Sequence, residues 1–484
     1  MLRLRSLCAL LLLIALPVFA EDAEDSRFEL KYGKNFNLVS GGRVTIDHGF
    51  GDLVIRTHEG NQVQVRANIR SSDDDIGKAI RIIAGESAGG VHVRTEFPEI
   101  RGQRHLSYSV DMTVTVPSNA HVQANNEFGS IDARGMRASG SFGNKQGAMR
   151  VQDATGNQTV TNSFGAIEII DVRGTVSVAN NNGAITIKRI AGPVTAANRF
   201  GAVHVTDVQS ATLANTNGAI EAMDIGGSLK AVNAFGQIKA STIAGSADLT
   251  TSNARVEVSN VSGSAIVKNS FGSVVARSIN GALTIDGNNS QIDAEDVGGN
   301  ATVDTGFGAV SLRNIRGSAK VTTQNGGLRV SDISGTFTAK TQFGSVQADR
   351  VGAAASVEST NGSVTLNEIG AGAKVRASFG PVFVNGVGAG VDIVNTNGAI
   401  AVAGLRGQGC QPVTLRTNFS SIKVSVPATA SYAVNASTSF GRVHSDLPVT
   451  TSGVSDGTLI GTIGRGGCKL ELANANGNIT IEKD

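Results

Sequence analysis

The sequence predicts an all-β protein folded as a parallel β-solenoid (β-helix) with 18-residue coils. Phe-Gly pairs recur with spacings of 35 or 36 residues, and Asn, mostly followed by Gly, stands midway between successive Phe positions. Apolar residues alternate with polar or small ones over short segments, as in Ile167/Ile169 and Val176/Val178, which is typical of β-strands. A fixed period indicates stacked repeats, in which each coil buries its apolar face against its neighbours.

The coil length follows from a second periodic position. The seventh residue after each corner glycine, or its Ala or Ser replacement, is a branched aliphatic residue at every step from Val172 to Leu405. The coil is therefore 18 residues long, and Phe and Asn alternate at one corner of it. We expect two strands in each coil, with three shorter ones as the alternative.

We interpret the Phe and Asn positions as a structural ladder in which each Phe ring is buried against the Asn coil between two Phe coils. The ladder residues are Phe128, Phe164, Phe200, Phe235, Phe271, Phe307, Phe343, Phe379, Asn182, Asn217, Asn253, Asn289, Asn325, Asn361 and Asn397. A further polar set two residues earlier, beginning with Asn162 and Asn180, would share this face and hydrogen-bond along the stack. Phe235→Ala is then expected to cost about 3–5 kcal/mol. The alternative is an aromatic binding stripe on the outside.

Residues 1–20 have the pattern of a cleaved secretory signal peptide. Arg3 and Arg5 precede an apolar run, and Val18-Phe19-Ala20 is typical of a cleavage site. We therefore expect an exported protein, periplasmic or at the cell surface or extracellular, with no transmembrane segment in the mature chain. Removing the two arginines from the 42 basic residues leaves 40 against 40 acidic ones, which argues against a nucleic-acid partner.

The mature chain divides into three predicted parts. Residues 21–126 are expected to form a β-rich N-terminal capping region with a short helix near 76–84, because an exposed solenoid end invites edge pairing. Residues 127–409 are the regular β-solenoid, and residues 410–484 form irregular C-terminal coils and a cap. Cys410 and Cys468 are a possible disulfide in an oxidising compartment, with two buried thiols as the alternative.

Three segments resemble the bacterial β-strand-repeat family of "putative adhesins", a DUF4097-like domain of unknown function. They are YSVDMTVTVPSNAHVQANNEFGSIDARG (108–135), SVPATASYAVNASTSFGRV (425–443) and GTIGRGGCKLELANANGNITI (461–481). The resemblance implies a secreted or envelope-associated β-solenoid and carries over no catalytic residues. Phe in place of Asn in alternate coils departs from the family pattern.

The sequence predicts no catalytic, cofactor-binding or metal site. Acidic residues such as Glu168 and Glu221 are scattered among Arg and Lys, and the nearly constant coil length leaves no inserted loop to wall a cleft. A calcium-binding β-roll would need Asp at turn positions where this chain has Arg189. The histidines lack tight metal-ligand spacing.

The function expected from these features is non-enzymatic binding or structural support through multivalent surface contacts. The partner would be an unknown envelope component, a glycan or a surface protein. The alternative is a polysaccharide-active β-helix enzyme, either a lyase or a hydrolase.

Overall fold

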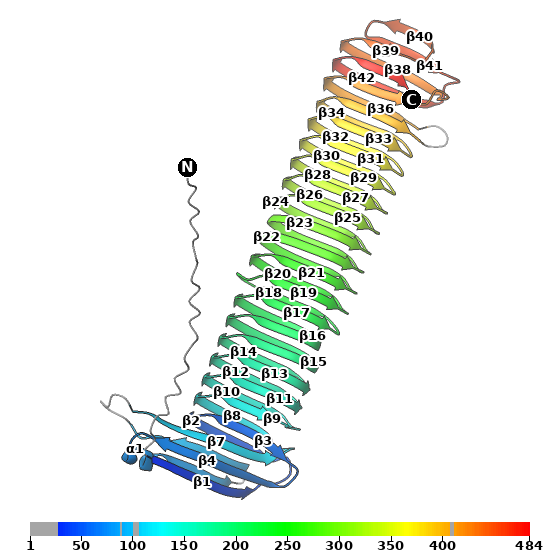
Figure 1. Cartoon of the computed structure of the whole chain (residues 1–484). Helices are drawn as coiled ribbons and strands as arrows, with labels where there is room; N and C mark the ends of the chain where they lie inside the picture. Colours follow the sequence, from blue (N-terminus) through cyan, green and yellow to red (C-terminus); the bar gives the residue numbers. More distant parts are fainter. Residues whose placement is uncertain (1–27, 88–89, 100–105, 407–410) are drawn as a thin grey trace, which may run out of the picture.

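The computed structural model describes residues 28–87, 90–99, 106–406 and 411–484, which form one long rod with the N-terminal strands at one end and the C-terminal strands at the other (Figure 1). The chain is nearly all β, with 73% of residues in strands and 1% in helix, and it forms a parallel solenoid of about 17 turns. The predicted fold class is confirmed.

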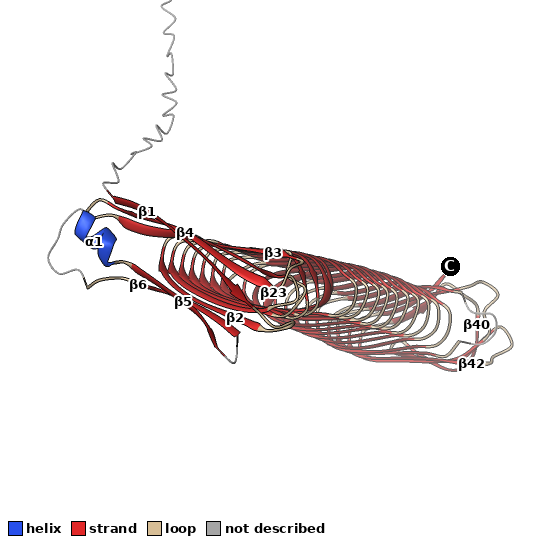
Figure 2. Cartoon of the chain, turned by 90° about the horizontal axis from the view of Figure 1, so that it is seen from below, coloured by secondary structure: helices blue, strands red, loops and turns tan. Residues whose placement is uncertain are grey.

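Each regular coil contains two strands. Residues pair in parallel with those 18 positions later, so that Ile167 lies beside Ile185 and Phe164 beside Asn182. Figure 2 shows the strands along the two long sides of the stacked coils, with loops at the narrow edges. The strands of the regular stack are β8 (His121–Phe128), β9 (Ile131–Arg134), β10 (Gly140–Gln146), β11 (Met149–Thr155), β12 (Gln158–Phe164), β13 (Ile167–Arg173), β14 (Val176–Asn182), β15 (Ile185–Phe200), β16 (Val203–Asn217), β17 (Ile220–Ile225), β18 (Leu229–Asn233), β19 (Ile238–Ile243), β20 (Ala247–Asn253), β21 (Val256–Val261), β22 (Ala265–Ile279), β23 (Leu283–Val297), β24 (Ala301–Phe307), β25 (Val310–Ile315), β26 (Ala319–Asn325), β27 (Leu328–Ile333), β28 (Phe337–Phe343), β29 (Val346–Val351), β30 (Ala355–Asn361), β31 (Val364–Ile369), β32 (Ala373–Phe379), β33 (Val382–Val387), β34 (Val391–Asn397), β35 (Ile400–Leu405), β36 (Val413–Phe419) and β37 (Ile422–Val426).

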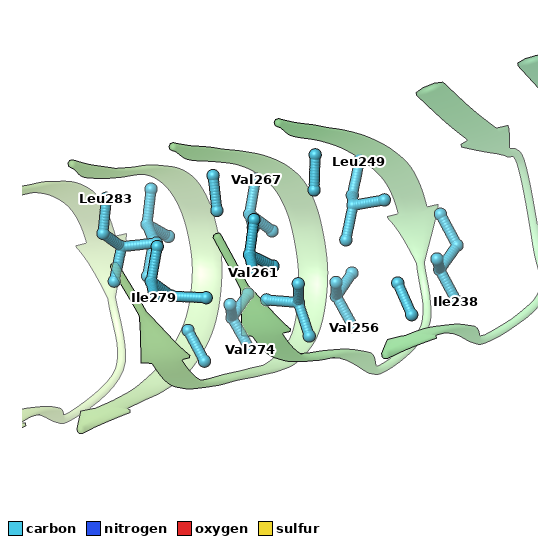
Figure 3. Close-up of a cluster of buried hydrophobic side chains, with 14 of the residues drawn as sticks. Ile238, Leu249, Val256, Val261, Val267, Val274, Ile279 and Leu283 are labelled. Atoms are coloured by element: carbon cyan, nitrogen blue, oxygen red, sulfur yellow. The ribbon is translucent and has the colours of Figure 1, made fainter. Parts of the chain in front are cut away.

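The core is a set of aliphatic columns that run along the inside of the rod. Figure 3 shows Val256 and Val261 of β21, and Val267 and Val274 of β22, pointing into the interior. The column predicted from the 18-residue spacing, from Val172 to Leu405, is buried throughout. Because every coil has a like residue above and below, burial of these side chains favours in-register stacking.

A left-handed residue bends the second strand of most coils just before this aliphatic column. The φ angle is between 54° and 59° at Asp153, Asp171, Arg189, Asp207, Asp224, Thr242, Asn260, Ser278, Asp296, Asn314, Asp332, Arg350 and Glu368. Asp and Asn tolerate this conformation better than most residues because their short polar side chains bond locally. The bend turns the following aliphatic residue inward and leaves a line of polar side chains outside.

The Phe-Gly corner needs glycine for two reasons. Gly165 has φ +129°, and a Cβ at this position would lie 2.2 Å from the carbonyl oxygen of Gly147 in the coil below. A side chain would therefore be strained and would also separate the two coils.

The N-terminal end is stacked in an order that differs from the chain order. Its elements are β1 (Phe28–Asn37), β2 (Arg43–Phe50), β3 (Leu53–His58), β4 (Gln62–Ser71), α1 (Asp74–Ala79), β5 (Arg81–Ser87), β6 (Gly90–Glu96) and β7 (Tyr108–Pro117). Strands β2 and β3 pair in parallel with β8 and β9 on one side and with β6 and β7 on the other. Antiparallel strands β4, β1 and β5 then close this end. The predicted helix is present, but it begins and ends earlier than expected because Asp73 caps its N-terminus.

The C-terminal end shows the same interleaving. Its strands are β38 (Tyr432–Phe440), β39 (Val443–Ser445), β40 (Val449–Ser455), β41 (Thr458–Ile463), β42 (Cys468–Asn476) and β43 (Ile479–Lys483). The last coil in the sequence, β42 and β43, lies between the β36–β37 coil and the β38–β39 coil. An antiparallel hairpin, β40 and β41, pairs with the outer edge of β38.

Candidate functional site: a row of exposed phenylalanines

The phenylalanine side chains of the predicted ladder lie on the outside of the rod, so the prediction that they are buried is wrong. Their exposed fractions range from 39% at Phe128 to 60% at Phe235. The pleat of the first strand is interrupted at the residue before each Phe: Asn162 pairs with Asn180 and Phe164 with Asn182, while Ser163 drops out of the pairing. Because alternation breaks there, the Phe that period-two counting placed inside turns outward.

We define the phenylalanine stripe as the line of exposed Phe residues at this corner, 39–75% exposed. It consists of Phe128, Phe164, Phe200, Phe235, Phe271, Phe307, Phe343, Phe379, Phe419 and Phe440. The chain has 18 Phe residues, and ten of them stand in this one line. Successive Phe residues are two coils apart, which is ~9.6 Å at the usual strand spacing.

The alternation of Phe and Asn is kept in space even where the chain order is not. Phe419 lies beside Asn476, and Asn476 lies beside Phe440, although Phe440 precedes Asn476 in the sequence. At the other end the rule is broken, because Gln146 stands between Phe128 and Phe164, and Phe128 stacks directly on Phe50 with ring centroids 4.8 Å apart. Phe50 also contacts Phe97 and Tyr108 edge-on, so the stripe ends there in an aromatic cluster.

The Asn residues of the predicted ladder also lie at the surface, and the hydrogen-bonded column is a different one. Asn182, Asn253 and Asn325 are exposed, and the other four, Asn217, Asn289, Asn361 and Asn397, are half-buried. Within the part of the chain that the structure describes, none of these seven side-chain amides hydrogen-bonds to protein. The expected ladder of bonds between them is therefore not formed there, and the seven amides face solvent beside the Phe rings.

The buried polar column, two residues earlier, fixes the corner instead. The Asn162 Nδ2 donates to the carbonyl oxygens of Gly147 (2.9 Å) and Gly165 (3.3 Å), which belong to successive coils. The Asn180 Nδ2 donates in the same way to Gly165 (3.0 Å) and Gly183 (3.2 Å). Each of these two amides thus bonds two backbone carbonyl groups and joins adjacent coils at the corner that carries Phe164.

His48 occupies the first position of this buried column, in register with Asn126. The His48 side chain is 4% exposed, and its Nδ1 lies 3.2 Å from the Thr95 hydroxyl. Burial lowers the pKa of His48 to about 4, against the opposing effect of Asp111 and Asp52. His48 is therefore neutral at pH 7.

A second surface feature runs along the line of left-handed residues. Hollows of about 670 Å³ and 480 Å³ follow one another from Gly135 to Ser262, and one of about 540 Å³ lies between Asn314 and Arg406. Charges of both signs line the hollows of 670 Å³ and 540 Å³ and form ion pairs there, whereas the charged residues that line the hollow of 480 Å³ are Asp207 and Asp224.

The clearest of these pairs is between Asp171 and Arg189. The Arg189 guanidinium donates to both Asp171 carboxylate oxygens, at 2.5 and 2.9 Å, and these hydrogen bonds hold the pKa of Asp171 below its usual range. Asp332 and Arg350 repeat this arrangement farther along the rod. These carboxylates are held ionised by a permanent cation, which suits structural pairing better than proton transfer.

Three further predictions concern chemistry and topology. Over residues 28–87, 90–99, 106–406 and 411–484, no group of three His, Cys, Asp or Glu side chains is placed to hold a metal ion. In the same ranges no helix has the length and apolar character to cross a membrane. Cys468 is buried and disulfide-bonded, while Cys410 and the predicted signal peptide lie outside the described residues.

Fold and surface together define a rod-shaped parallel β-solenoid that carries one continuous aromatic line. Residues 283–482 match the family model described as Toastrack DUF4097, which confirms the resemblance over this part of the chain. No protein with a curated description matches the sequence.

Solved structures of two bacterial proteins align with part of the rod. One is a "putative cell adhesion protein" from Clostridium sporogenes, with 8% identity, a TM-score of 0.20, and coverage of 53% of this chain and 100% of that one. The other is a "putative adhesin" from Bacteroides fragilis, with 10% identity, a TM-score of 0.23, and coverage of 55% and 97%. Similarity at this level carries no argument about function.

Proposed function

We propose that this protein is an exported, non-enzymatic binding rod that attaches to an envelope or cell-surface component through the phenylalanine stripe. The observation that carries the proposal is the row of ten exposed Phe side chains on one line. A Phe side chain offers about 150–250 Å², so ten half-exposed rings present on the order of 1,000 Å² of apolar surface. Soluble monomers rarely expose so much apolar surface in one place unless it contacts something.

The arrangement favours many weak contacts over one strong contact. Each ring offers a small area, but the rings are held at fixed positions by paired strands and by the buried Asn column. A partner with matching repeats would lose little additional freedom after its first contact, so successive contacts add to the avidity.

An enzymatic function is less well supported by the same surfaces. The acids that line the hollow of 670 Å³ include Asp171, which forms two hydrogen bonds with Arg189 in the next coil. A glycosidase needs two carboxyl groups facing each other across a substrate, one of them with a raised pKa. The pKa of Asp171 is instead lowered by its Arg partner.

The proposal is tested by retention on surface material. Purified full-length protein is incubated with washed cell-envelope fractions, and the triple variant Phe271→Ala/Phe307→Ala/Phe343→Ala is compared with the unchanged protein. We expect at least a tenfold loss of affinity, because three adjacent contacts are removed. The matched control is Phe383→Ala, since Phe383 is also 45% exposed but lies off the stripe. Equal retention of the triple variant, or release of sugar fragments by the purified protein, would contradict the proposal.

A further inference from the structure

We infer that the ligand of the phenylalanine stripe is an extended, neutral, β-linked glycan chain that lies along the rod. This inference rests on the proposed binding function and assigns its substrate class. It depends on the charge, the hydrogen-bonding groups and the spacing of the stripe, which are independent of one another.

The middle of the stripe is free of charge at its immediate flanks. From Ser270 to Pro381, the residue before each Phe or Asn and the residue two positions after it are uncharged. They are Ser270, Ser273, Asn288, Gln291, Gly306, Ala309, Gln324, Gly327, Gln342, Ser345, Thr360, Ser363, Ser378 and Pro381. Charged side chains begin three positions before the Phe, and both signs occur there, as in Asp304 and Lys340. A nucleic acid or an anionic membrane surface would need a row of cations, which this line does not offer.

The groups between the rings are hydrogen-bonding amides without a protein partner. Asn289, Asn325 and Asn361 alternate with the Phe rings in register, and their amides make no hydrogen bond to the described residues. A β-linked pyranose with equatorial substituents has axial C–H groups on its faces and hydroxyl groups around its rim. The Phe rings can pack against such an apolar face, and the amides can donate to and accept from the hydroxyls.

The spacing fits a chain that repeats every two sugars. In an extended β-linked glycan, successive sugars are turned over, so that the same face returns once per disaccharide. The Phe rings return once per two coils, ~9.6 Å, which is close to the length of such a disaccharide. A coiled α-linked chain would leave this straight line after one or two contacts.

A second copy of the rod is a poorer occupant of the stripe. If two rods packed Phe against Asn, each contact would cover an amide with an aromatic ring and leave it without a hydrogen-bond partner. Burying a polar group in this way is unfavourable. A glycan avoids the penalty because its hydroxyls replace the water that is displaced from each amide.

The experiment uses insoluble cellulose and chitin as neutral β-linked probes and soluble amylose as the α-linked comparison. Full-length protein is sedimented with each insoluble polymer, and amylose is assayed by affinity electrophoresis. We expect binding to at least one β-linked polymer, little change between low and high salt, and no binding to amylose. The Phe271→Ala/Phe307→Ala/Phe343→Ala variant should bind at least tenfold more weakly, Asn289→Ala/Asn325→Ala a few-fold more weakly, and Phe383→Ala unchanged.

Several outcomes would overturn the glycan assignment. Suppose that the triple variant loses binding to envelope fractions, but the unchanged protein binds neither β-linked polymer. The glycan assignment is then wrong, while the proposed binding function stands. The glycan assignment is also wrong if the triple variant and the unchanged protein bind the β-linked polymers equally well. Sedimentation velocity provides a separate check, because a dimer that forms at micromolar concentration and is lost in the triple variant would identify a second copy as the occupant.

Discussion

At the scale of single residues, two Asn residues only two positions apart have opposite roles. Asn180 is buried and donates two hydrogen bonds to corner carbonyl groups, whereas Asn182 faces solvent without a bond to the described protein. The same residue type therefore stabilises the coil at one position and offers an amide to a ligand at the next outward position.

Replacing the two Asn residues separates these roles. Asn180→Ala removes two hydrogen bonds, one to the Gly165 carbonyl and one to the Gly183 carbonyl, while Asn162 and Asn198 still donate to these two oxygens. We expect a loss of about 1–3 kcal/mol in unfolding free energy for the two bonds. Asn182→Ala, the matched control, should stay within about 0.5 kcal/mol. Urea unfolding followed by circular dichroism measures both, and equal effects would show that the buried amides do not hold the corner.

The His48 side chain makes the stability of the N-terminal end depend on pH. Its pKa is about 4 in the folded protein, below the ordinary value of 6.5, so the unfolded chain binds the proton more tightly. Stability is therefore complete above about pH 6.5 and falls as the pH drops towards 4, by up to about 3 kcal/mol.

Variant His48→Asn tests this account, because Asn is the residue at the same column position in the next coil. We expect the variant to lose less stability than the unchanged protein between pH 7 and pH 5, as measured by hydrogen exchange of β2 and β8 amides. Parallel pH profiles in the two proteins would show that His48 does not cause the dependence.

At the scale of elements, the coil β42–β43 lies between two other coils of the C-terminal end. It pairs in parallel with β36 and β37 on one side and with β38 and β39 on the other. Leu470 and Leu472 from this coil are buried in the core. The coils on either side therefore depend on a segment that follows both of them in the sequence.

Deleting residues 468–484 should unfold the C-terminal end but not the rod. Strands β38 and β39 would lose their parallel neighbours, and the β40–β41 hairpin depends on β38. The β36–β37 coil keeps its pairing with β34 and β35, because solenoid coils contact only adjacent coils. Limited proteolysis is expected to trim the chain back to about residue 426 and to spare the regular stack. Full protection of the C-terminal strands, or proteolysis along the whole rod, would contradict this view of the β42–β43 coil.

The regular part of this architecture was predictable from sequence, and the ends were not. Spacing alone located the coil length and the buried aliphatic column from Val172 to Leu405, because both repeat with every coil. The outward position of Phe164 was not predictable, since it depends on a break in the pleat at Ser163 that no residue type marks.

The interleaved stacking of the C-terminal end was also missed, although the sequence holds a signal for it. Phe419 and Phe440 follow each other without an intervening Asn-Gly coil, and the Asn476-Gly477 coil comes only afterwards. Strict alternation of Phe and Asn would have placed Asn476 between them, where it is found.

At the scale of the whole molecule, the stacked coils hold the repeated Phe side chains at fixed positions. Parallel pairing along about 17 turns holds the ten rings of the stripe in a line. A flexible chain with the same residues would have to be ordered by its ligand, at an entropic cost for each contact. The rod is ordered by its own core, so the proposed contacts would not have to order it.

The most direct test of this central claim is the dissociation constant for envelope material as a function of the number of stripe Phe residues replaced by Ala. One, three and five adjacent replacements around Phe307 are compared, with melting temperature as the check that the rod stays folded. We predict that the dissociation constant rises each time another Phe is replaced, because each ring is one contact of many. An affinity that does not change with the number of Phe residues removed would contradict it.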